Sequence, residues 1–223
     1  MSSTLAFADD LSVPAQEALR DLLLDLTKAK QHLAFQYASW CIRAPSVEAN
    51  IALAGMSQEE LGHAGVLDGL LGDDFQHPVP GKDELVRWDR WSASTDDFAM
   101  LETWPGMVVS CLALDASAGA TIEVLKSCSY ARLAQRALKM SQEEQFHILF
   151  GIETSRSFRA LPGDATKGLA GLYARSLADA ETRFGSGRAL ARLMELGLLP
   201  TTANGVRAKF LQGVAQRFHA ACG

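Results

Sequence analysis

Hydrophobic side chains recur every three or four residues along most of the chain, and almost no segment alternates with a period of two. This pattern predicts four long helices over about 14–42, 46–71, 104–128 and 129–160, and shorter helices near 165–184, 187–198 and 202–220. Pro14 suits the first turn of a helix, and Ser46 suits the N-cap of the second helix. The chain is therefore predicted to be all-α.

Residues 72–103 interrupt the helical pattern with prolines, a glycine and scattered acidic residues, and predict a long crossover connection. Aromatic residues predict that the connection packs against the body: Phe75, Trp88, Trp91 and Phe98. Two helices, a crossover and two more helices are typical of a ferritin-like four-helix bundle. We expect one such domain over 1–223, with a core bundle over 14–160 and additional C-terminal helices over 164–220. An irregular helical array without a central site is the alternative.

Composition restricts the classes of protein. With 223 residues, 48% hydrophobic and 21% charged, the chain can bury a sizeable core and is not predicted to be disordered. The net charge of -5 disfavours nucleic-acid binding. The cysteines form no CxxC pair, no signal peptide is evident, and no apolar stretch approaches the roughly 20 residues that span a bilayer. We therefore expect a soluble cytoplasmic protein that binds neither nucleic acid nor membrane.

One eight-residue pattern occurs twice. Residues 56–63 read Met-Ser-Gln-Glu-Glu-Leu-Gly-His and residues 140–147 read Met-Ser-Gln-Glu-Glu-Gln-Phe-His, an offset of 84 residues. Each copy lies within a predicted long helix and contains Glu-x-x-His. Because residues three apart share one face of a helix, both side chains of a motif can reach one metal ion. The four side chains are Glu60, His63, Glu144 and His147.

Helical phase distinguishes an interior site from two solvated helix surfaces. The four motif side chains fall on the apolar stripes of their helices. These stripes contain Leu53, Met56, Ala64, Leu67 and Leu70 on one helix, and Leu133, Ala137, Met140, Phe150 and Thr154 on the other. An unpaired buried carboxylate is costly, so we expect an inward-facing metal site in which the acids have partners. Glu59 and Glu143 each precede a motif glutamate by one residue, so their side chains point about 100° away from it around the helix. We expect them at the surface or just behind the ligands.

The other two long helices each place one polar residue on an apolar stripe. Asp115 is the only charged residue on the stripe of the third helix, whereas the first helix has Lys30. Lys30 stands 30 residues before Glu60, and Asp115 stands 29 residues before Glu144. The two halves therefore supply similar half-sites, with a lysine where symmetry expects an acid. A lysine that extends to solvent at the bundle edge is the alternative.

These residues resemble the ferritin-like di-iron monooxygenase subunits of the phenylacetyl-coenzyme A epoxidase type, in the phenylacetic acid catabolic protein family. The resemblance covers about residues 28–160. It rests on five segments: Trp40-Cys41-Ile42-Arg43-Ala44-Pro45, Glu59-Glu60-Leu61-Gly62-His63-Ala64, Leu114-Asp115, Ser129-Tyr130 and Glu143-Glu144-Gln145-Phe146-His147.

The resemblance implies an oxygen-activating oxidoreductase that acts on a small organic or coenzyme A-linked substrate. It implies five iron ligands, Glu60, His63, Asp115, Glu144 and His147. The family's catalytic subunit has a glutamate at the sixth position, where this chain has Lys30. The family also includes a scaffold subunit that has lost ligands, so a non-catalytic or metal-free scaffold is the alternative. Implied partners are a reductase and either a second copy or a related ferritin-like subunit.

Charge counting suggests what Lys30 does. The three acids carry three negative charges, which one divalent ion and one ammonium would balance. Our hypothesis is that the ammonium stands where one metal's charge would be, so that fewer than two irons bind. Two irons, one iron and none all remain open. Lys30 is the candidate catalytic residue, because it could hold a substrate acid or help to protonate a reaction intermediate.

Other ferritin-like classes fit less well. An iron-handling or rubrerythrin-like protein is one such class, but the chain has no cysteine pairs for a rubredoxin centre. The excess of acidic over basic residues disfavours a transfer-RNA hydroxylase. Radical-generating subunits, some of which carry a lysine in place of a metal-binding acid, remain open. Tyr37 could be a redox group, a hydrogen-bonding group or a core side chain, and small residues 116–120 either allow close helix packing or leave room for a substrate.

Overall fold

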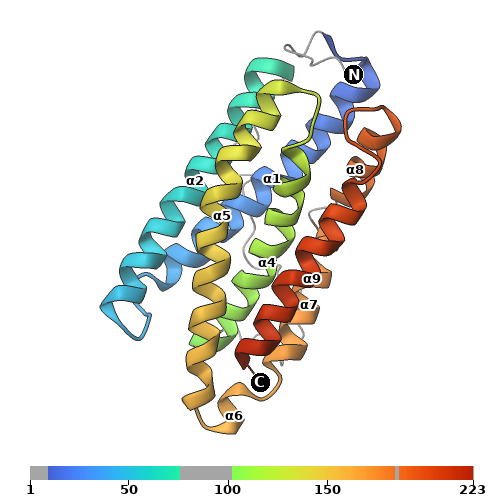
Figure 1. Ribbon diagram of the computed structural model, residues 1–223. Coiled ribbons are helices and arrows are strands. Elements are labelled where there is room, and N and C mark those ends of the chain that lie inside the picture. Colours follow the sequence, from blue (N-terminus) through green and yellow to red (C-terminus); the bar gives the residue numbers. More distant parts are fainter. Residues whose placement is uncertain (1–9, 76–101, 184–185, 223) are drawn as a thin grey trace.

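The computed structural model describes residues 10–75, 102–183 and 186–222, and over these ranges the chain forms helices and no strands (Figure 1). Four long helices form the bundle: α1 (Val13–Trp40), α2 (Val47–Phe75), α4 (Trp104–Leu125) and α5 (Ala131–Ser157). A 3-10 turn (Phe158–Ala160) and α6 (Gly163–Thr166) lead to α7 (Leu169–Arg183), α8 (Ser186–Glu195) and α9 (Ala203–Cys222). The expected all-α, ferritin-like fold is confirmed. The single domain stays a prediction.

The starts of the first two helices follow their capping signals. α1 has a proline in its first turn, and the Ser46 hydroxyl accepts a hydrogen bond from the Ala49 amide at 3.2 Å at the start of α2. The predicted end of this helix at about residue 71, just before Gly72-Asp73-Asp74, is wrong, because α2 continues to Phe75. Glycine and aspartate are poor helix formers but do not oblige a helix to stop. Phe75 belongs to α2 rather than to the crossover, and the expected packing of Trp88, Trp91 and Phe98 lies outside the described residues.

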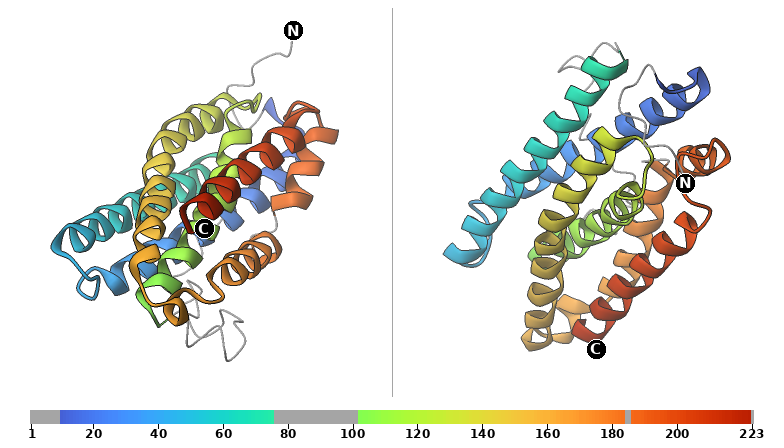
Figure 2. Two further views of the ribbon diagram at one scale, coloured as in Figure 1. Left: turned by 60° about the horizontal axis from the view of Figure 1, so that its bottom comes forward. Right: turned by 45° about the horizontal axis from the view of Figure 1, so that its top comes forward.

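α4 is the central helix. It packs against α1, α5, α7 and α9, and the views in Figure 2 show it among these helices. At its start the Thr103 hydroxyl accepts a hydrogen bond from the Gly106 amide at 3.2 Å. Every residue of α4 is buried except Trp104 and Glu123. Since almost no part of this helix meets solvent, it is apolar all round rather than amphipathic.

The length and composition of α4 would allow it to cross a membrane, and it is the one such helix in the described part of the chain. The expectation that no apolar stretch approaches the membrane-spanning length of roughly 20 residues is therefore wrong. However, 94% of its most apolar window is buried inside the protein. This burial is typical of the core helix of a soluble protein.

Small residues let α4 approach its neighbours closely. A methyl group added at Gly119 would lie 3.3 Å from the ring of Phe210 on α9. On α5, a methyl group at Gly151 would lie 3.0 Å from the Leu112 side chain of α4. Because larger side chains would force these helices apart, close packing is the role that the structure supports for residues 116–120.

α2 contains glycines that packing within the described chain does not explain. An added methyl group would meet nothing within 4 Å at Gly55, Gly62, Gly65 or Gly69. A glycine inside a helix costs about 1 kcal/mol relative to alanine. Four such residues therefore weaken α2 with no compensating contact among the described residues.

Candidate metal centre

Six polar side chains from the four bundle helices meet inside the protein. They are Lys30 of α1, Glu60 and His63 of α2, Asp115 of α4, and Glu144 and His147 of α5. None exposes more than 5% of its surface. The predicted apolar stripes of α2 and α5 face the core over most of their length and direct the motif side chains inward. The structure thus brings together all six residues that the sequence singled out.

Four of the six can present a ligand atom to one common point. These atoms lie within 4.8 Å of one another and belong to Glu60, Asp115, Glu144 and His147. His63 lies beside this set, with its Nδ1 3.1 Å from Glu144 Oε1 and 3.7 Å from Glu60 Oε2. The centre is therefore asymmetric, although α2 and α5 carry the same motif.

The Lys30 ammonium lies between the glutamates of α2 and α5. Its Nζ is 2.5 Å from Glu144 Oε1, and 3.2 Å and 3.1 Å from the two carboxylate oxygens of Glu60. Burial disfavours the charged form, but the carboxylates of Glu144, Glu60 and Asp115 outweigh it and raise the pKa of Lys30 above its ordinary value. The side chain is completely buried, so the structure rules out the solvent-exposed alternative.

The acids of the cluster respond to burial in opposite ways. Burial raises the pKa of Glu60, but the Lys30 ammonium, the hydrogen bond with His147 and the nearby His63 ring outweigh it and hold this pKa far below its usual range. For Asp115, burial is the largest cause; together with the nearby glutamates it outweighs His147 and Lys30 and raises the pKa to about 7. Glu60 is thus a firmly charged carboxylate, whereas Asp115 takes up a proton much more readily than Glu60 does.

Each histidine is held by a glutamate of the opposite helix. His63 on α2 makes a hydrogen bond of 2.6 Å through Nε2 with Glu143 of α5. His147 on α5 makes one of 2.8 Å through Nε2 with Glu59 of α2. In both cases Nδ1 faces the cluster. A carboxylate at Nε2 favours the proton there and leaves Nδ1 free to bind a metal.

Both imidazoles also take part in the charge balance. Burial lowers their pKa values, but hydrogen bonds with carboxylates outweigh it and raise the pKa of His63 to about 9 and that of His147 to about 10. The protonated rings help to neutralise the acids around them. Because a histidine ligand must be neutral, binding of a divalent ion would release a proton.

Tyr37 extends the cluster along α1. Its hydroxyl donates a hydrogen bond to Asp115 Oδ2, and its ring meets that of His147 edge-on with 6.0 Å between the ring centroids. Burial, and then the charge of Asp115, raises the pKa of Tyr37 well above its ordinary value, so the phenol remains a donor. Tyr37 is thus a core side chain that also hydrogen-bonds to the cluster. A redox role stays a prediction.

The buried donor atoms fit a metal ion. Asp115 Oδ1 and Glu144 Oε2 are buried and have no hydrogen-bond partner among the described residues. Leaving such atoms unpaired is costly. Carboxylate oxygens together with an imidazole nitrogen form the donor set of non-haem iron sites and of ferritin-like carboxylate centres. The residues present are therefore suited to holding a metal ion.

Sequence reasoning placed Glu59 and Glu143 without giving them partners. The sequence did contain a signal that these two glutamates have a role. Both lie within the pentapeptide that is identical in the two copies, and a residue that only contacts solvent need not be identical in both. The histidine that each one holds depends on the distance between α2 and α5, which the pentapeptide does not contain.

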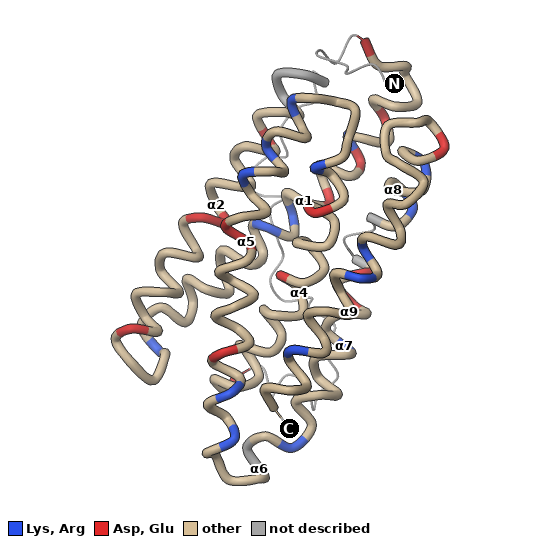
Figure 3. Tube along the Cα trace, in the orientation of Figure 1, with Lys and Arg blue, Asp and Glu red and all other residues tan. Residues whose placement is uncertain are grey.

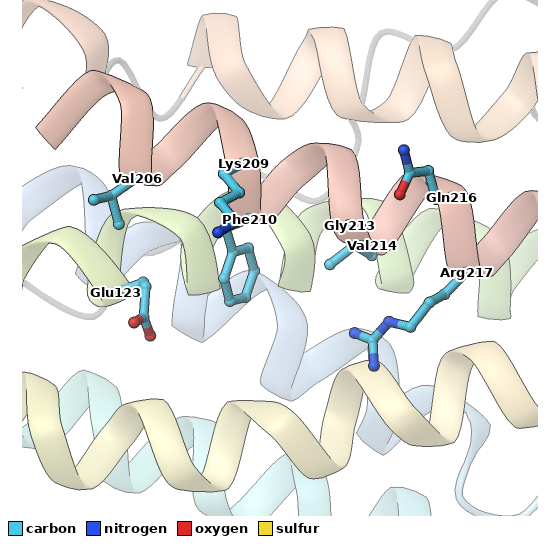
Figure 4. Close-up of a pocket in the computed structure, with 8 residues that line it drawn as sticks. All are labelled: Glu123, Val206, Lys209, Phe210, Gly213, Val214, Gln216 and Arg217. Carbon is cyan, nitrogen blue, oxygen red and sulfur yellow. The ribbon is translucent and has the colours of Figure 1, made fainter. Parts of the chain in front are cut away.

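One described groove lies away from the cluster, between α9 and the neighbouring helices (Figure 4). Its volume is about 680 Å³, and it is lined by Glu123, Val206, Lys209, Phe210, Gly213, Val214, Gln216 and Arg217. None of the six cluster residues lines it. The groove is thus separate from the candidate metal centre.

The helical bundle and its paired Glu-x-x-His motifs define a ferritin-like protein of the carboxylate–histidine class. Within this class, the model of the phenylacetic acid catabolic protein family matches residues 5–221, and the chain belongs to this family. The family is of the di-iron type, and its members are subunits of multicomponent complexes. No curated protein matches the chain. The family resemblance seen in the sequence is confirmed.

Proposed function

We propose that the protein is an oxygen-activating oxidoreductase of the monooxygenase or epoxidase type whose metal site is altered by Lys30. Membership in the phenylacetic acid catabolic protein family and the buried Glu/Asp/His cluster support this function. The observation that carries the proposal is the contact of Lys30 Nζ with the glutamates of both Glu-x-x-His motifs.

The contacts divide the cluster into two unequal parts. Glu144 Oε1 lies near both Lys30 Nζ and His63 Nδ1, at 2.5 Å and 3.1 Å. On the other side, His147 Nδ1 is 2.9 Å from Glu60 Oε1 and 4.0 Å from Asp115 Oδ1. In our proposal the ammonium takes the place of one divalent ion, beside His63.

The remaining donors would hold one iron: Glu60, Asp115, Glu144 and His147. Their three negative charges would be balanced by one divalent ion and the ammonium. When bound, iron supplies the one-electron chemistry that activates dioxygen. Hydrogen bonding by Glu59 holds the imidazole of His147 in the orientation for ligation, and Lys30 places a positive charge inside the buried core.

The substrate we propose is a small organic or coenzyme A-linked molecule of phenylacetic acid catabolism. Dioxygen activation needs electrons, so a soluble reductase is the proposed redox partner. We also propose pairing with a second copy or a related ferritin-like subunit, in keeping with a family of complex subunits. The four free cysteines and the burial of α4 support a cytoplasmic location.

Iron content per chain tests the role of Lys30. After anaerobic loading and desalting, we expect about one iron in the parent and about two in Lys30→Glu, which restores the fourth carboxylate of a two-metal bundle site. Lys28→Glu is the matched control, because Lys28 lies on the exposed side of the same helix. Circular dichroism checks that each variant is folded.

Other results would reject this assignment. About two irons in the parent would mean that Lys30 does not replace a metal. If the folded Lys30→Glu variant bound no more iron than the parent, the ammonium-for-metal hypothesis would be wrong.

The alternative is a scaffold subunit without metal. One observation favours it: Lys30 and His147 already form hydrogen bonds with the acids around them, and the His63 ring lies 3.1 Å from Glu144. Folded protein that binds no iron, in the parent and in Lys30→Glu alike, would support this alternative over the oxidoreductase.

A further inference from the structure

The two copies of the repeat differ most on the sides that face outward. Six positions on α2 form what we call the α2 ridge: Ile51, Gly55, Gln58, Gly62, Gly65 and Gly69. The equivalent positions, 84 residues later, form the α5 ridge: Gln135, Lys139, Gln142, Phe146, Leu149 and Glu153. All twelve residues are exposed. Their alternating spacing of three and four residues places each set along one line of its helix.

The α2 ridge is hollow where the α5 ridge is bulky. Four of the six α2 positions are glycines, and an added methyl group at any of them would meet no described atom within 4 Å outside its own helix backbone. On the α5 ridge the positions equivalent to Gly62 and Gly65 are Phe146 and Leu149, which are 70% and 47% exposed. Single exposed apolar residues are ordinary, but a bulky ridge that matches a hollow one indicates a surface built for contact.

The two helices also carry complementary charge. α2 has acidic residues and no lysine or arginine. The first half of α5 exposes Arg132, Arg136 and Lys139. In Figure 3, blue segments follow the upper part of that helix. In an antiparallel pair, the basic first half of α5 faces the last turns of α2, where the helix dipole is negative.

The arrangement of α2 and α5 allows both contacts to form at once. Figures 1 and 2 show the two helices side by side and running in opposite directions, and the crosswise histidine–glutamate bonds join them. A twofold axis parallel to the helices would place α2 of each copy against α5 of the other. The same complementary contact would then occur twice.

We propose that two copies of this chain associate through this face, with the α2 ridge of each copy packed against the α5 ridge of the other. Phe146 and Leu149 fill the hollows left by the glycines. The side chains of Glu59 and Glu143, which are 48% and 33% exposed and hold the histidines, lie next to the ridges and become less exposed to water. This association does not depend on iron or on oxygen chemistry.

Sedimentation velocity of the full chain over a range of micromolar concentrations tests the interface. We expect the parent to form a dimer. For Gly62→Gln and for Phe146→Gln we expect the dissociation constant of the dimer to be higher than that of the parent by about tenfold or more. Gly62→Gln fills a hollow with a better helix former, and Phe146→Gln removes an exposed apolar side chain. Neither change is expected to impair folding, and circular dichroism checks this.

Two matched controls use the same substitutions away from the ridges. Gly205 on α9 is an exposed helical glycine with open space around it, and Leu161 is 40% exposed beyond α5. Gly205→Gln and Leu161→Gln should leave the dissociation constant unchanged. A monomeric parent would overturn the proposal, as would a dimer that both ridge variants leave intact or that the controls weaken equally.

Discussion

α2 and α5 carry the same motif, yet they face different partners. α2 packs mainly against α1, which carries Lys30, whereas α5 packs mainly against α4, which carries Asp115. Lys30 Nζ lies within 2.5 Å of Glu144 Oε1, while Asp115 keeps one oxygen without a hydrogen-bond partner among the described residues. The comparison shows that a repeated motif does not by itself make two equivalent metal sites. Neighbouring helices decide which charged group stands beside each motif: the Lys30 ammonium contacts Glu60 and Glu144, and the Asp115 carboxylate lies beside His147.

Removing the ammonium should change the molecule most. Lys30→Met leaves Glu60 and Glu144 buried without their cation, and loss of one partner of a buried ion pair costs about 3–5 kcal/mol. We expect a fall of this size in the free energy of unfolding of the metal-free protein, measured in urea. Lys126→Met is the control: Lys126 forms a surface ion pair of 2.6 Å with Glu123, and its loss should cost less than about 1 kcal/mol. Similar losses in both variants would contradict the structural role of Lys30.

The two histidines should differ in their effect on metal binding. His147 belongs to the set of four donors that share a common point, and His63 does not. His147→Gln should lower iron affinity by more than the about 10–100-fold that loss of an outer partner costs, and His63→Gln by less. Anaerobic titration against a competing chelator measures both. Equal losses would mean that the two motifs form equivalent sites.

Substitutions of Glu59 and Glu143 should also differ in their effect on iron affinity, but each effect should be smaller than that of substituting the histidine that the glutamate holds. Glu59 holds His147, so Glu59→Gln should weaken iron binding by about 10–100-fold. Glu143 holds His63, and Glu143→Gln should have a smaller effect because its histidine lies outside the set of four. Nitrogen NMR of the imidazoles in the metal-free variants shows whether the tautomer changes. An effect of Glu143→Gln larger than that of Glu59→Gln would reverse our assignment of the metal-binding half.

The smallest effect is expected at Tyr37. Tyr37→Phe removes the hydrogen bond to Asp115 and should lower the free energy of unfolding by about 1–2 kcal/mol. Tyr173→Phe is a matched control, because the buried hydroxyl of Tyr173 has no hydrogen-bond partner among the described residues. Denaturation in urea should therefore show no loss for Tyr173→Phe. A loss as large as that of Tyr37→Phe would show that the Asp115 bond is not the cause.

Periodicity predicted the fold well where a helix has one buried face. The apolar stripes of α1 and α2 are buried as expected, because burial of such a stripe against the core dominates helix packing. α4 gave a weaker signal, since a helix that is apolar on nearly every side has a less distinct stripe. Its central position follows from the covering helices α7 and α9. The end of α2 was missed because glycine and aspartate only lower helix propensity.

For the candidate site, the sequence was sufficient to name the six side chains and to direct them inward. Helical geometry carries that inference, because it sets which residues share a face. The structure brings the six together, and their role as metal ligands stays a prediction. The crosswise partners of Glu59 and Glu143 could not be predicted, because they depend on contacts between helices far apart in sequence.

By itself, the sequence determined the helical class, the family and the identity of the polar residues that enter the core. Tertiary structure alone decided that His63 lies outside the set of four donors and that Lys30 reaches both glutamates. The physical reason is one of scale. Hydrophobic periodicity sets the direction of a side chain to within a helix face, whereas ligand and hydrogen-bond distances depend on how the packed core spaces and rotates whole helices.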